Sequence, residues 1–440
     1  MSFRHAQSVA CIIALAALVN PADSQPQIVA GQSISLESAQ KRQAIAELAA
    51  LLRARYAVAA TAEKAATHLE RQLAAGTYDS IATAGSFASA ITADLRRVTG
   101  DRHLDFGVVT RPAATTAVRS PDAERTARLV EIRRGNYGLP RTEVLPGNVG
   151  YLEVRRFQSP DLAGDTISAA VQFLANADAV IIDLRNCHGG SPYAMPIFAG
   201  YFVASPVHLF DMEFRGDDYT DHYWTSPWLP GKRLAGVPLY ILTSPYTFSG
   251  AEGLAYRFQI LKRATIIGET TAGGANAGGL LDVAPFFRIW MPMGRPVDRD
   301  TSGNWEGTGV TPDIRVAASD ALAIAHGEAL KALRAKAVTE EEKRAIDWAL
   351  TCAAARHHPP TLSQRDHERL AGSYGEGRVW FEGGQLRFQF GTDTPYLLTA
   401  ISATLFTADT DDPIRLEFLD GDVLIFTDED RVPHQLRRSN

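Results

Sequence analysis

The stretch VPLYILTSPYTFSGAEGLAYRFQILKRATIIGE, residues 237–269, predicts a strand, a serine, a helix and a second strand in direct succession. Its apolar run at 237–242 ends in turn-forming residues, and a helical pattern then runs from Gly250 to about Arg263. Ser249 stands at this junction, where the partial positive charge of a helix N-terminus favours a developing oxyanion. We therefore predict that Ser249 is a nucleophile.

The length and composition indicate a globular protein with several domains. The chain has 440 residues, of which 45% are hydrophobic and 21% are charged, and its formal net charge is −6. A single hydrophobic core rarely serves a chain of this length, so we expect about two to four domains. Binding to nucleic acid or to an anionic membrane surface needs a basic face, which this charge does not support. We predict no nucleic-acid partner, and the oligomeric state stays open.

The N-terminus has the pattern of a cleavable signal peptide, assigned to residues 1–24. A basic start with Arg4 is followed by an apolar segment over 9–19 and then by small residues. The apolar segment is too short to cross a bilayer comfortably, which favours a cleaved leader over an anchor. We expect export to the periplasm or the exterior without stable membrane insertion, and Cys11 would leave with the leader.

The cysteines and the glycine-rich turns do not indicate a metal or a nucleotide. Only Cys187 and Cys352 would remain after cleavage, and they allow one disulfide or none. No cysteine or histidine spacing resembles a zinc site. The glycine-rich residues 270–283 lack the phosphate-loop pattern and contain no basic side chain. We predict no metal and no cofactor.

The periodicity divides the rest of the chain into three parts. Alanine, leucine and arginine at helical spacing over 25–98 predict a small helical bundle. Strand and helix patterns alternate over 99–357, with short strands expected at 128–157, and predict an α/β core with parallel pairing. Short alternating runs separated by Gly and Asp over 358–440 predict an all-β module, curled or barrel-like.

Two distant residues are candidates for activating the serine. A serine hydroxyl is a poor nucleophile, so it needs a base, and the base needs a group that fixes its tautomer. His103 is the candidate base, and Glu306 is the candidate orienting group. The competing interpretation is a surface loop histidine paired with Asp101 or Asp105, together with a solvated loop glutamate.

Three glycines are candidates for binding an oxyanion. Gly189 and Gly190 follow a buried strand predicted at 178–186, and Gly250 follows the serine. Glycine lets the backbone approach a ligand closely and turn its N–H groups outward. A glycine pair on its own more often only makes a turn, so the position after a core strand carries this prediction.

Residues 210–231 are expected to be irregular and are rich in aromatic side chains. Tyr219, Tyr223, Trp224 and Trp228 either line a substrate cleft or pack a long loop onto the core. His222 is expected to be structural.

Four ordered motifs resemble one family of serine peptidases. They are AVIIDLRNCHGG (179–190), LTSPYTFSGAEGLAY (242–256), RATIIGETTAGG (263–274) and EGTGVTPDI (306–314). The family comprises the C-terminal-processing (tail-specific) proteases, the tricorn core and the repeats of interphotoreceptor retinoid-binding protein. The N-terminal helices ending in GDRHLDF look most like the retinoid-binding-protein-like bacterial members. The resemblance implies a ClpP/crotonase-like α/β core.

The resemblance also implies roles for the candidate residues. Ser249 matches the family nucleophile, and Gly250 with the Gly189–Gly190 turn matches its oxyanion hole. In the tricorn-like branch a histidine from the N-terminal side is the base, and a glutamate just before a G-V-x-P-D motif orients it. His103 and Glu306 match these two places.

The chain departs from other branches of the family at three places. Processing proteases use a lysine in the glycine-rich turn after the serine, but here that turn holds Gly273–Gly274 and no lysine. The tricorn core has a serine immediately before its histidine, whereas this chain has Arg102. The segment 99–150 is too short for the peptide-binding domain usual in processing proteases. A lysine base is therefore excluded, and recognition of protein tails is not expected.

We predict an exported serine peptidase that cleaves peptide bonds through an acyl-enzyme at Ser249, with peptides or proteins as substrates. The main alternative is a non-catalytic binder of lipid or another hydrophobic ligand, as the retinoid-binding relatives suggest. An esterase that uses the same serine is the third interpretation.

Overall fold

The computed structural model describes residues 34–109, 121–216, 220–284, 286–408, 414–419, 422–427 and 433–439. The predicted signal peptide at 1–24, with Cys11, lies outside these residues. The chain divides into two compact units. The first holds Met1–Thr142, Tyr151–Ala175 and Ile182–Ala318, and the second holds Glu143–Gly150, Asn176–Ile181 and Ser319–Asn440. The domain boundaries expected from the sequence stay a prediction.

Three helices open the described chain, as the helical spacing predicts. They are α1 (Ser38–Arg55), α2 (Ala59–Ala74) and α3 (Ala84–Thr99). Their apolar faces bury Leu48, Leu52 and Phe87, each fully excluded from solvent. Helix α3 ends at Gly100, whose φ of 75° is a left-handed conformation that glycine adopts without strain. This turn leads the chain directly into the segment that carries His103.

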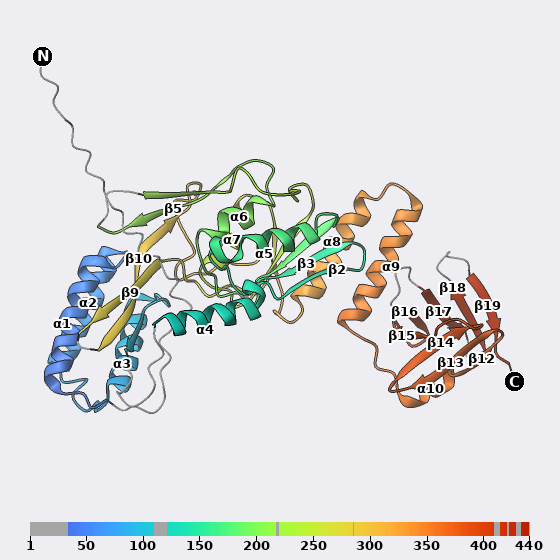
Figure 1. Cartoon of the computed structure of the whole chain (residues 1–440), viewed down its shortest axis with the longest axis horizontal. Helices are drawn as coiled ribbons and strands as arrows, with labels where there is room; N and C mark the ends of the chain where they lie inside the picture. Colours follow the sequence, from blue (N-terminus) through green and yellow to red (C-terminus); the bar gives the residue numbers. More distant parts are fainter. Residues whose placement is uncertain are drawn as a thin grey trace, which may run out of the picture. The chain divides into compact units, whose positions relative to one another are not determined.

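An antiparallel sheet packs against these helices. Its strands are β1 (Asp105–Val108), β5 (His208–Phe214), β6 (Thr220–Trp224), β9 (Ala277–Val283) and β10 (Phe287–Val297). The order is β1-β10-β5-β6, and β9 also pairs with β10. Phe287, Ile289 and Met291 of β10 share one hydrophobic core with the three helices, and Figure 1 shows these helices beside β9 and β10.

Part of the segment that was expected to be irregular belongs to this sheet. Strands β5 and β6 pair antiparallel across it, with Phe210 opposite Tyr223. Their rings stack with centroids 4.6 Å apart, and Tyr223 is only 8% exposed. The expectation of an irregular segment was wrong here, because alternating aromatic and polar side chains fit a strand with one buried face.

A six-stranded sheet carries the serine. Its strands are β2 (Arg141–Leu145), β3 (Val149–Glu153), β4 (Ala179–Asp183), β7 (Leu239–Thr243), β8 (Thr265–Gly268) and β11 (Ile314–Arg315), in the order β11-β8-β7-β4-β3-β2. Strand β8 is parallel to both β7 and β11. Every residue of β4 and β7 is buried, as expected for central strands of an α/β core. Three helices follow these strands: α5 (Pro160–Phe173), α6 (Ala194–Gly200) and α7 (Gly250–Ile260).

The strands expected over 128–157 begin later than predicted. Residues Pro121–Arg134 form helix α4, which is followed by the short 3₁₀ turn η2 (Asn136–Gly138). The sequence PDAERTARLVEIRR is rich in alanine, glutamate and arginine, which are strong helix formers, and it begins with a proline at the first helical position. Strand structure starts only at β2.

The C-terminal part contains three helices and then a β module. The helices are α8 (Ala321–Lys336), α9 (Glu340–His357) and α10 (Gln364–Leu370). The strands are β12 (Gly372–Tyr374), β13 (Gly377–Glu382), β14 (Gln385–Phe390), β15 (Tyr396–Ala400), β16 (Leu405–Ala408), β17 (Ile414–Leu419), β18 (Val423–Thr427) and β19 (Pro433–Arg437).

This module is an antiparallel meander that closes on itself. Its eight strands pair in sequence order. A bridge between Tyr374 and Arg438 then joins the first strand to the residue after the last one. Phe388, Leu416 and Leu424 are fully buried in its core. The predicted fold, an α/β core with N-terminal helices and a C-terminal all-β module, is confirmed.

Two further features bear on the predictions. Cys187 is buried, Cys352 is half-buried, and both are free thiols. No helix in the described ranges has the length and apolarity needed to cross a bilayer.

Candidate active site

Ser249 lies between strand β7 and helix α7 in a strained backbone conformation. It is the N-cap of α7, with φ of 56° and ψ of −124°. Side chains other than glycine rarely adopt a positive φ, and such strain persists only where the surroundings impose it, most often at functional sites. The residue is half-buried. The strained turn between strand and helix therefore holds the serine at the end of a buried strand, where it remains accessible.

Glu252 fixes this turn from inside the protein. Its carboxylate accepts hydrogen bonds from the N–H of Ser249 (2.8 Å), Gly273 (2.6 Å) and Gly274 (2.9 Å) and from the Thr271 hydroxyl (2.5 Å). Burial raises the pKa of Glu252, while these hydrogen bonds oppose the shift. The side chain is fully buried. Glu252 thus ties the serine turn to the glycine-rich turn that follows β8.

We expect Glu252→Gln to destabilise this part of the fold and to lower turnover. A glutamine offers one acceptor oxygen where the carboxylate offers two, so at least one buried N–H loses its partner, at a cost of about 1–3 kcal/mol. Chemical denaturation and kcat measure the two effects. The matched control is Glu213→Gln on an exposed residue of β5. Equal unfolding free energies for the two variants would contradict this role.

The Gly189–Gly190 turn packs directly against the serine. Both glycines have positive φ, 80° and 142°. A Cβ on Gly189 would lie 2.6 Å from the nitrogen of Gly250 and 2.9 Å from the Ser249 Cβ, and a Cβ on Gly190 would lie 2.1 Å from the carbonyl oxygen of Phe157. Only glycine fits at either position. The three glycines predicted to form an oxyanion site therefore lie together beside Ser249.

The three glycines differ in exposure, because Gly189 is buried next to Cys187. Burial raises the pKa of the Cys187 thiol to about 12, although a hydrogen bond from the Gly189 backbone lowers it. Gly190 and Gly250 are half-buried, and within the described ranges their N–H groups donate to no protein acceptor. The assignment of Gly189, Gly190 and Gly250 as donors to a bound oxyanion stays a prediction.

His103 packs against the residue that precedes the serine. Its ring centroid lies 4.3 Å from that of Phe248, and the residue is only 9% exposed, so it is not a surface loop histidine. Gly274 provides the space, because a Cβ there would lie 2.1 Å from Phe248 Cε2 and 2.9 Å from His103 Cε1. The glycine-rich turn that contains no lysine is therefore in contact with the histidine ring.

Glu306 lies beside His103, as the sequence predicts. Its Oε2 accepts hydrogen bonds from the N–H of Ala275 (2.6 Å) and Asn276 (3.0 Å). Its Oε1 and the Nδ1 of His103 are both buried, and neither makes a hydrogen bond to another described residue. Asp101, His103 and Glu306 each contribute one nitrogen or oxygen atom to a cluster in which these three atoms all lie within 4.8 Å of one another. Burial, and then the charge of Asp101, raise the pKa of Glu306 to about 7.

The same trio has the donor types of a metal site, but most of its oxygens are already engaged. Asp101 accepts hydrogen bonds from the backbone of His103 and from the side chains of Tyr56 and Asn276. One oxygen of Glu306 accepts two backbone N–H groups. Oxygens held by N–H and O–H donors suit a proton-transfer site better than a cation site. The absence of a metal and of a cofactor stays a prediction.

Two residues of the site were not singled out from the sequence. A serine at the N-cap followed by a glutamate three residues later is the pattern of a capping box. This pattern indicates that Glu252 caps the helix, but it does not predict the hydrogen bonds of Glu252 to residues 271–274. Asp101 was considered only as a partner of a surface histidine. Its burial depends on Tyr56 and Asn276, which are distant in the sequence and could not be foreseen.

The aromatic side chains of 210–231 divide between the two interpretations. Tyr223 packs in the core, whereas Trp224 and Trp228 are 47% and 76% exposed. Tyr219 lies outside the described residues. The Nδ1 of His222 lies 2.6 Å from Asp211 Oδ1, and the structural role of His222 stays a prediction.

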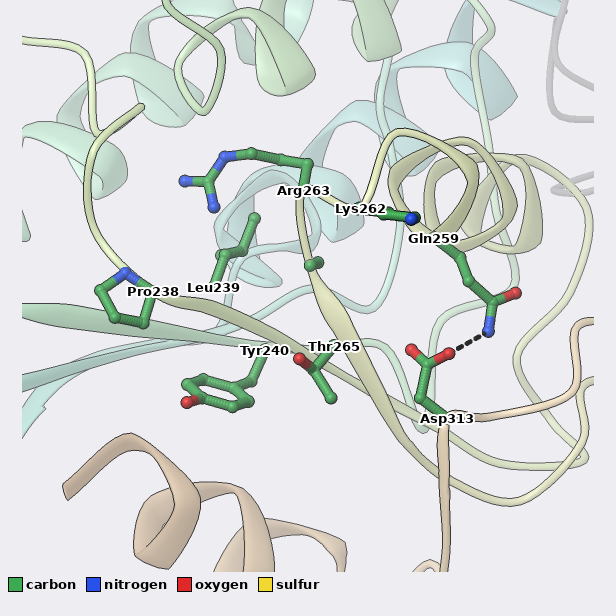
Figure 2. A pocket seen from close by; sticks show the side chains of 9 residues that line it. Pro238, Leu239, Tyr240, Gln259, Lys262, Arg263, Thr265 and Asp313 are labelled. Atoms are coloured by element: carbon green, nitrogen blue, oxygen red, sulfur yellow. Dashed lines mark hydrogen bonds between the residues drawn. The ribbon is translucent and has the colours of Figure 1, made fainter. Parts of the chain in front are cut away.

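A pocket of about 350 Å³ lies away from the serine. Figure 2 shows its lining, in which Gln259 donates a hydrogen bond of 2.8 Å to Asp313. The pocket is formed where α7 ends and β7 and β8 begin. Helix α7 has 11 residues and spans roughly 16 Å at 1.5 Å per residue, and Ser249 stands at its other end. Ligands of α/β sheets bind at the carboxyl ends of strands, so this pocket is not the candidate active site.

Comparison with known proteins identifies the family. Residues 148–316 match the model of "Peptidase family S41", and residues 29–133 match that of the "N-terminal domain of Peptidase_S41 in eukaryotic IRBP". Among solved structures, a photosystem II D1 C-terminal processing protease is 14% identical, with a TM-score of 0.41 over 63% of this chain and 93% of that one.

Two other solved structures are similar in the same measure. A putative peptidase from Parabacteroides merdae is 15% identical, with a TM-score of 0.44 over 63% of this chain and 90% of its own. The tricorn protease is 12% identical, with a TM-score of 0.42 over 72% of this chain and 37% of its own. The two family models lie in succession along the sequence and include the motifs around Ser249, Gly190 and Glu306. The chain belongs to peptidase family S41 and is a serine-type peptidase.

Proposed function

We propose that this protein is an exported peptidase that cleaves peptide bonds through an acyl-enzyme at Ser249. The observation that carries the proposal is the packing of His103 on Phe248, which brings a histidine and its carboxylate neighbours to the strained serine turn. A histidine, a carboxylate and free backbone donors around one serine form the set that acyl transfer requires.

In the proposed reaction, His103 transfers one proton in each step. The Ser249 oxygen attacks the peptide carbonyl carbon while His103 takes the hydroxyl proton, and the carbonyl oxygen becomes an oxyanion. The N–H group of Gly250, together with that of Gly189 or Gly190, stabilises that charge. When the C–N bond breaks, His103 returns the proton to the leaving amine. A water molecule then releases the acyl group with the same base, which restores the serine.

Glu306 supports the charge that forms on His103. Each of the two has one buried polar atom that makes no hydrogen bond in the part of the chain that the structure describes, His103 Nδ1 and Glu306 Oε1. Such hydrogen bonds are often long in an unliganded site and shorten around the substrate. An ionised Glu306 stabilises the imidazolium and fixes its tautomer.

We expect turnover to rise with pH as Glu306 ionises. Burial raises the pKa of Glu306 to about 7, so near pH 6 most of the protein would carry a protonated Glu306 that cannot stabilise the imidazolium. A kcat/KM profile from pH 5 to pH 9 should therefore rise through about 7. Glu306→Gln should lose this rise together with most of its activity. A parent profile that is flat between pH 5 and pH 8 would contradict the role of Glu306.

The same pKa has the opposite effect on stability. Because the folded protein holds the Glu306 proton more tightly than the unfolded chain, this group stabilises the fold fully below its unfolded pKa. The contribution is lost as the pH rises through about 7. The pH range that activates the site is thus the range in which it loses stability.

Two other functions use the same site. A non-catalytic binder would leave the serine without turnover, and an esterase would hydrolyse activated esters but not peptides. Hydrolysis of fluorescein-labelled casein by the full chain, measured beside a p-nitrophenyl ester, separates the three. Casein cleavage supports the peptidase, ester cleavage alone supports the esterase, and neither supports the binder. The retained Ser249, His103 and Glu306 favour an enzyme, since a binder does not need them together.

Export is the remaining part of the proposal. It is supported by the basic start and short apolar segment of residues 1–24. Mass spectrometry of the mature protein after expression in a bacterium would show an N-terminus near residue 25 if the leader is cleaved. An intact Met1 in the cytoplasmic fraction would contradict export.

A further inference from the structure

Asp101 is a second carboxylate at His103, and the proposed mechanism gives it no role. It is fully buried. Its Oδ1 accepts the backbone N–H of His103 at 2.9 Å and lies 3.6 Å from the Nδ1 of the same residue. Its Oδ2 accepts the Tyr56 hydroxyl at 2.9 Å and the Asn276 side-chain amide at 3.1 Å. Three donors therefore hold this carboxylate in one place, beside the ring of the proposed base.

Asn276 joins the two carboxylates of the site. Its backbone N–H donates to Glu306 at 3.0 Å, and its side-chain amide donates to Asp101 at 3.1 Å. Through this one residue the positions of Asp101 and Glu306 are fixed relative to each other. Both carboxylates lie within reach of His103.

The two carboxylates differ in charge. Burial opposes the ionisation of Asp101, but the hydrogen bond and charge of His103 hold its pKa below the usual value. Burial and the charge of Asp101 raise the pKa of Glu306 to about 7. The titratable groups that face Glu306 are Asp101, His103 and Tyr56. Below neutral pH, Asp101 thus carries the negative charge of the pair and Glu306 carries the proton.

We propose that Asp101 is a positioning residue that acts with Glu306 in fixing the orientation and ring tautomer of His103. Asp101 contacts the histidine at two places, because it accepts a hydrogen bond from the backbone N–H and lies near the ring nitrogen Nδ1. Asp101 in turn accepts hydrogen bonds from Tyr56 and Asn276. The proposal rests on the proposed function, because it assumes that His103 is the base.

The first test is Asp101→Asn in the full chain, with kcat and KM measured from pH 5 to pH 9. We expect kcat to fall on the order of 10²–10⁴-fold with little change in KM, because an asparagine does not stabilise an imidazolium or select its tautomer. The rise assigned to Glu306 should move to lower pH, because the charge that opposes its ionisation is gone. A residue that only stabilises the fold would lower the active fraction without moving the profile.

The matched control is Asp105→Asn, the same change two residues after His103 instead of two before it. The Asp105 side chain is 30% exposed and lies 3.6 Å from Arg96 Nη2. We expect its kcat and its pH profile to follow the parent. An Asp101→Asn variant that also follows the parent in both measurements would overturn the proposal.

Histidine ring signals give a readout that does not depend on catalysis. In protein labelled with ¹⁵N-histidine, the His103 signals are assigned by their loss in His103→Gln. We expect Asp101→Asn to shift these signals and Asp105→Asn to leave them in place. If the full chain proves to be inactive, the shift still tests Asp101, so failure of the proposed function and failure of this inference are distinguishable. Unchanged ring signals in Asp101→Asn would count against it.

Tyr56→Phe controls for instability, because Asp101→Asn changes a fully buried residue. Tyr56→Phe removes one donor to Asp101 and keeps the carboxylate and its contacts with His103. We expect a modest loss of stability, a far smaller fall in kcat and no displacement of the pH profile. An equal fall in kcat in both variants would assign Asp101 to folding alone.

Parent activity that is lost to a chelator and restored by Zn²⁺ would make the trio a metal site and overturn the positioning role.

Discussion

Ser249→Ala is expected to abolish peptide hydrolysis, with kcat falling on the order of 10⁴–10⁶-fold while the protein stays folded. Without the hydroxyl no acyl-enzyme forms, and only the oxyanion donors and binding remain to assist attack by water. The fold should persist because alanine keeps the Cβ and the same backbone preference. The strain at φ of 56° is therefore no greater than in the parent.

Labelled casein and circular dichroism measure the two expectations for Ser249→Ala. Ser205→Ala, a change of an exposed serine in the same unit, is the control and should match the parent. A Ser249→Ala protein that cleaves casein as fast as the Ser205→Ala protein would remove Ser249 from the mechanism.

His103→Ala should reduce kcat nearly as much as the loss of the serine, because residues that act as one unit show strongly non-additive effects. The glycine-rich turn after β8 contains no lysine that could replace the base. Combining His103→Ala with Ser249→Ala should add little to either single loss. Some loss of stability is also expected, since the ring fills the space between Gly274 and Phe248.

The control for His103→Ala is His222→Ala. His222 is exposed and pairs with Asp211, and it makes no contact with the serine turn in any described hydrogen bond. We expect its kcat to equal that of the parent. If His103→Ala retained the parent's rate and pH profile, another group would have to be the base.

The candidate residues could be predicted from the sequence where each had its own local signal. Ser249 stands between an apolar run and a helical pattern, and Gly189–Gly190 follows a continuous apolar strand. The resemblance then assigned His103 and Glu306, which lie 146 and 57 positions from the serine. The structure brings these residues together, but their catalytic roles stay predictions until the variants are measured.

The network that surrounds the candidates could not be predicted, because it depends on contacts between distant segments. The burial of Asp101 requires Tyr56 at the end of α1 and Asn276 before β9. The four bonds to Glu252 depend on how closely the turn after β8 approaches α7. Neither approach leaves a periodic signal in the sequence. The pKa of Glu306 likewise follows from burial and from Asp101.

The fold was predictable in class and less so in detail. Hydrophobic periodicity identified the N-terminal helices, the buried parallel strands and the C-terminal β module. It failed at residues 128–134, which belong to a helix rich in arginine instead of the expected strand, and at β5 and β6, where turn residues surround a strand pair. Both errors arose in segments whose burial is decided by neighbours rather than by their own pattern.

Covalent labelling by a fluorophosphonate probe tests most directly whether Ser249 is the nucleophile. The full chain is incubated with the probe, and the modified residue is located by mass spectrometry of its peptides. We expect one adduct on Ser249, formed far more slowly in His103→Ala and absent from Ser249→Ala. A folded parent protein that stays unlabelled, or that is labelled at another residue while Ser249 remains free, would contradict this expectation.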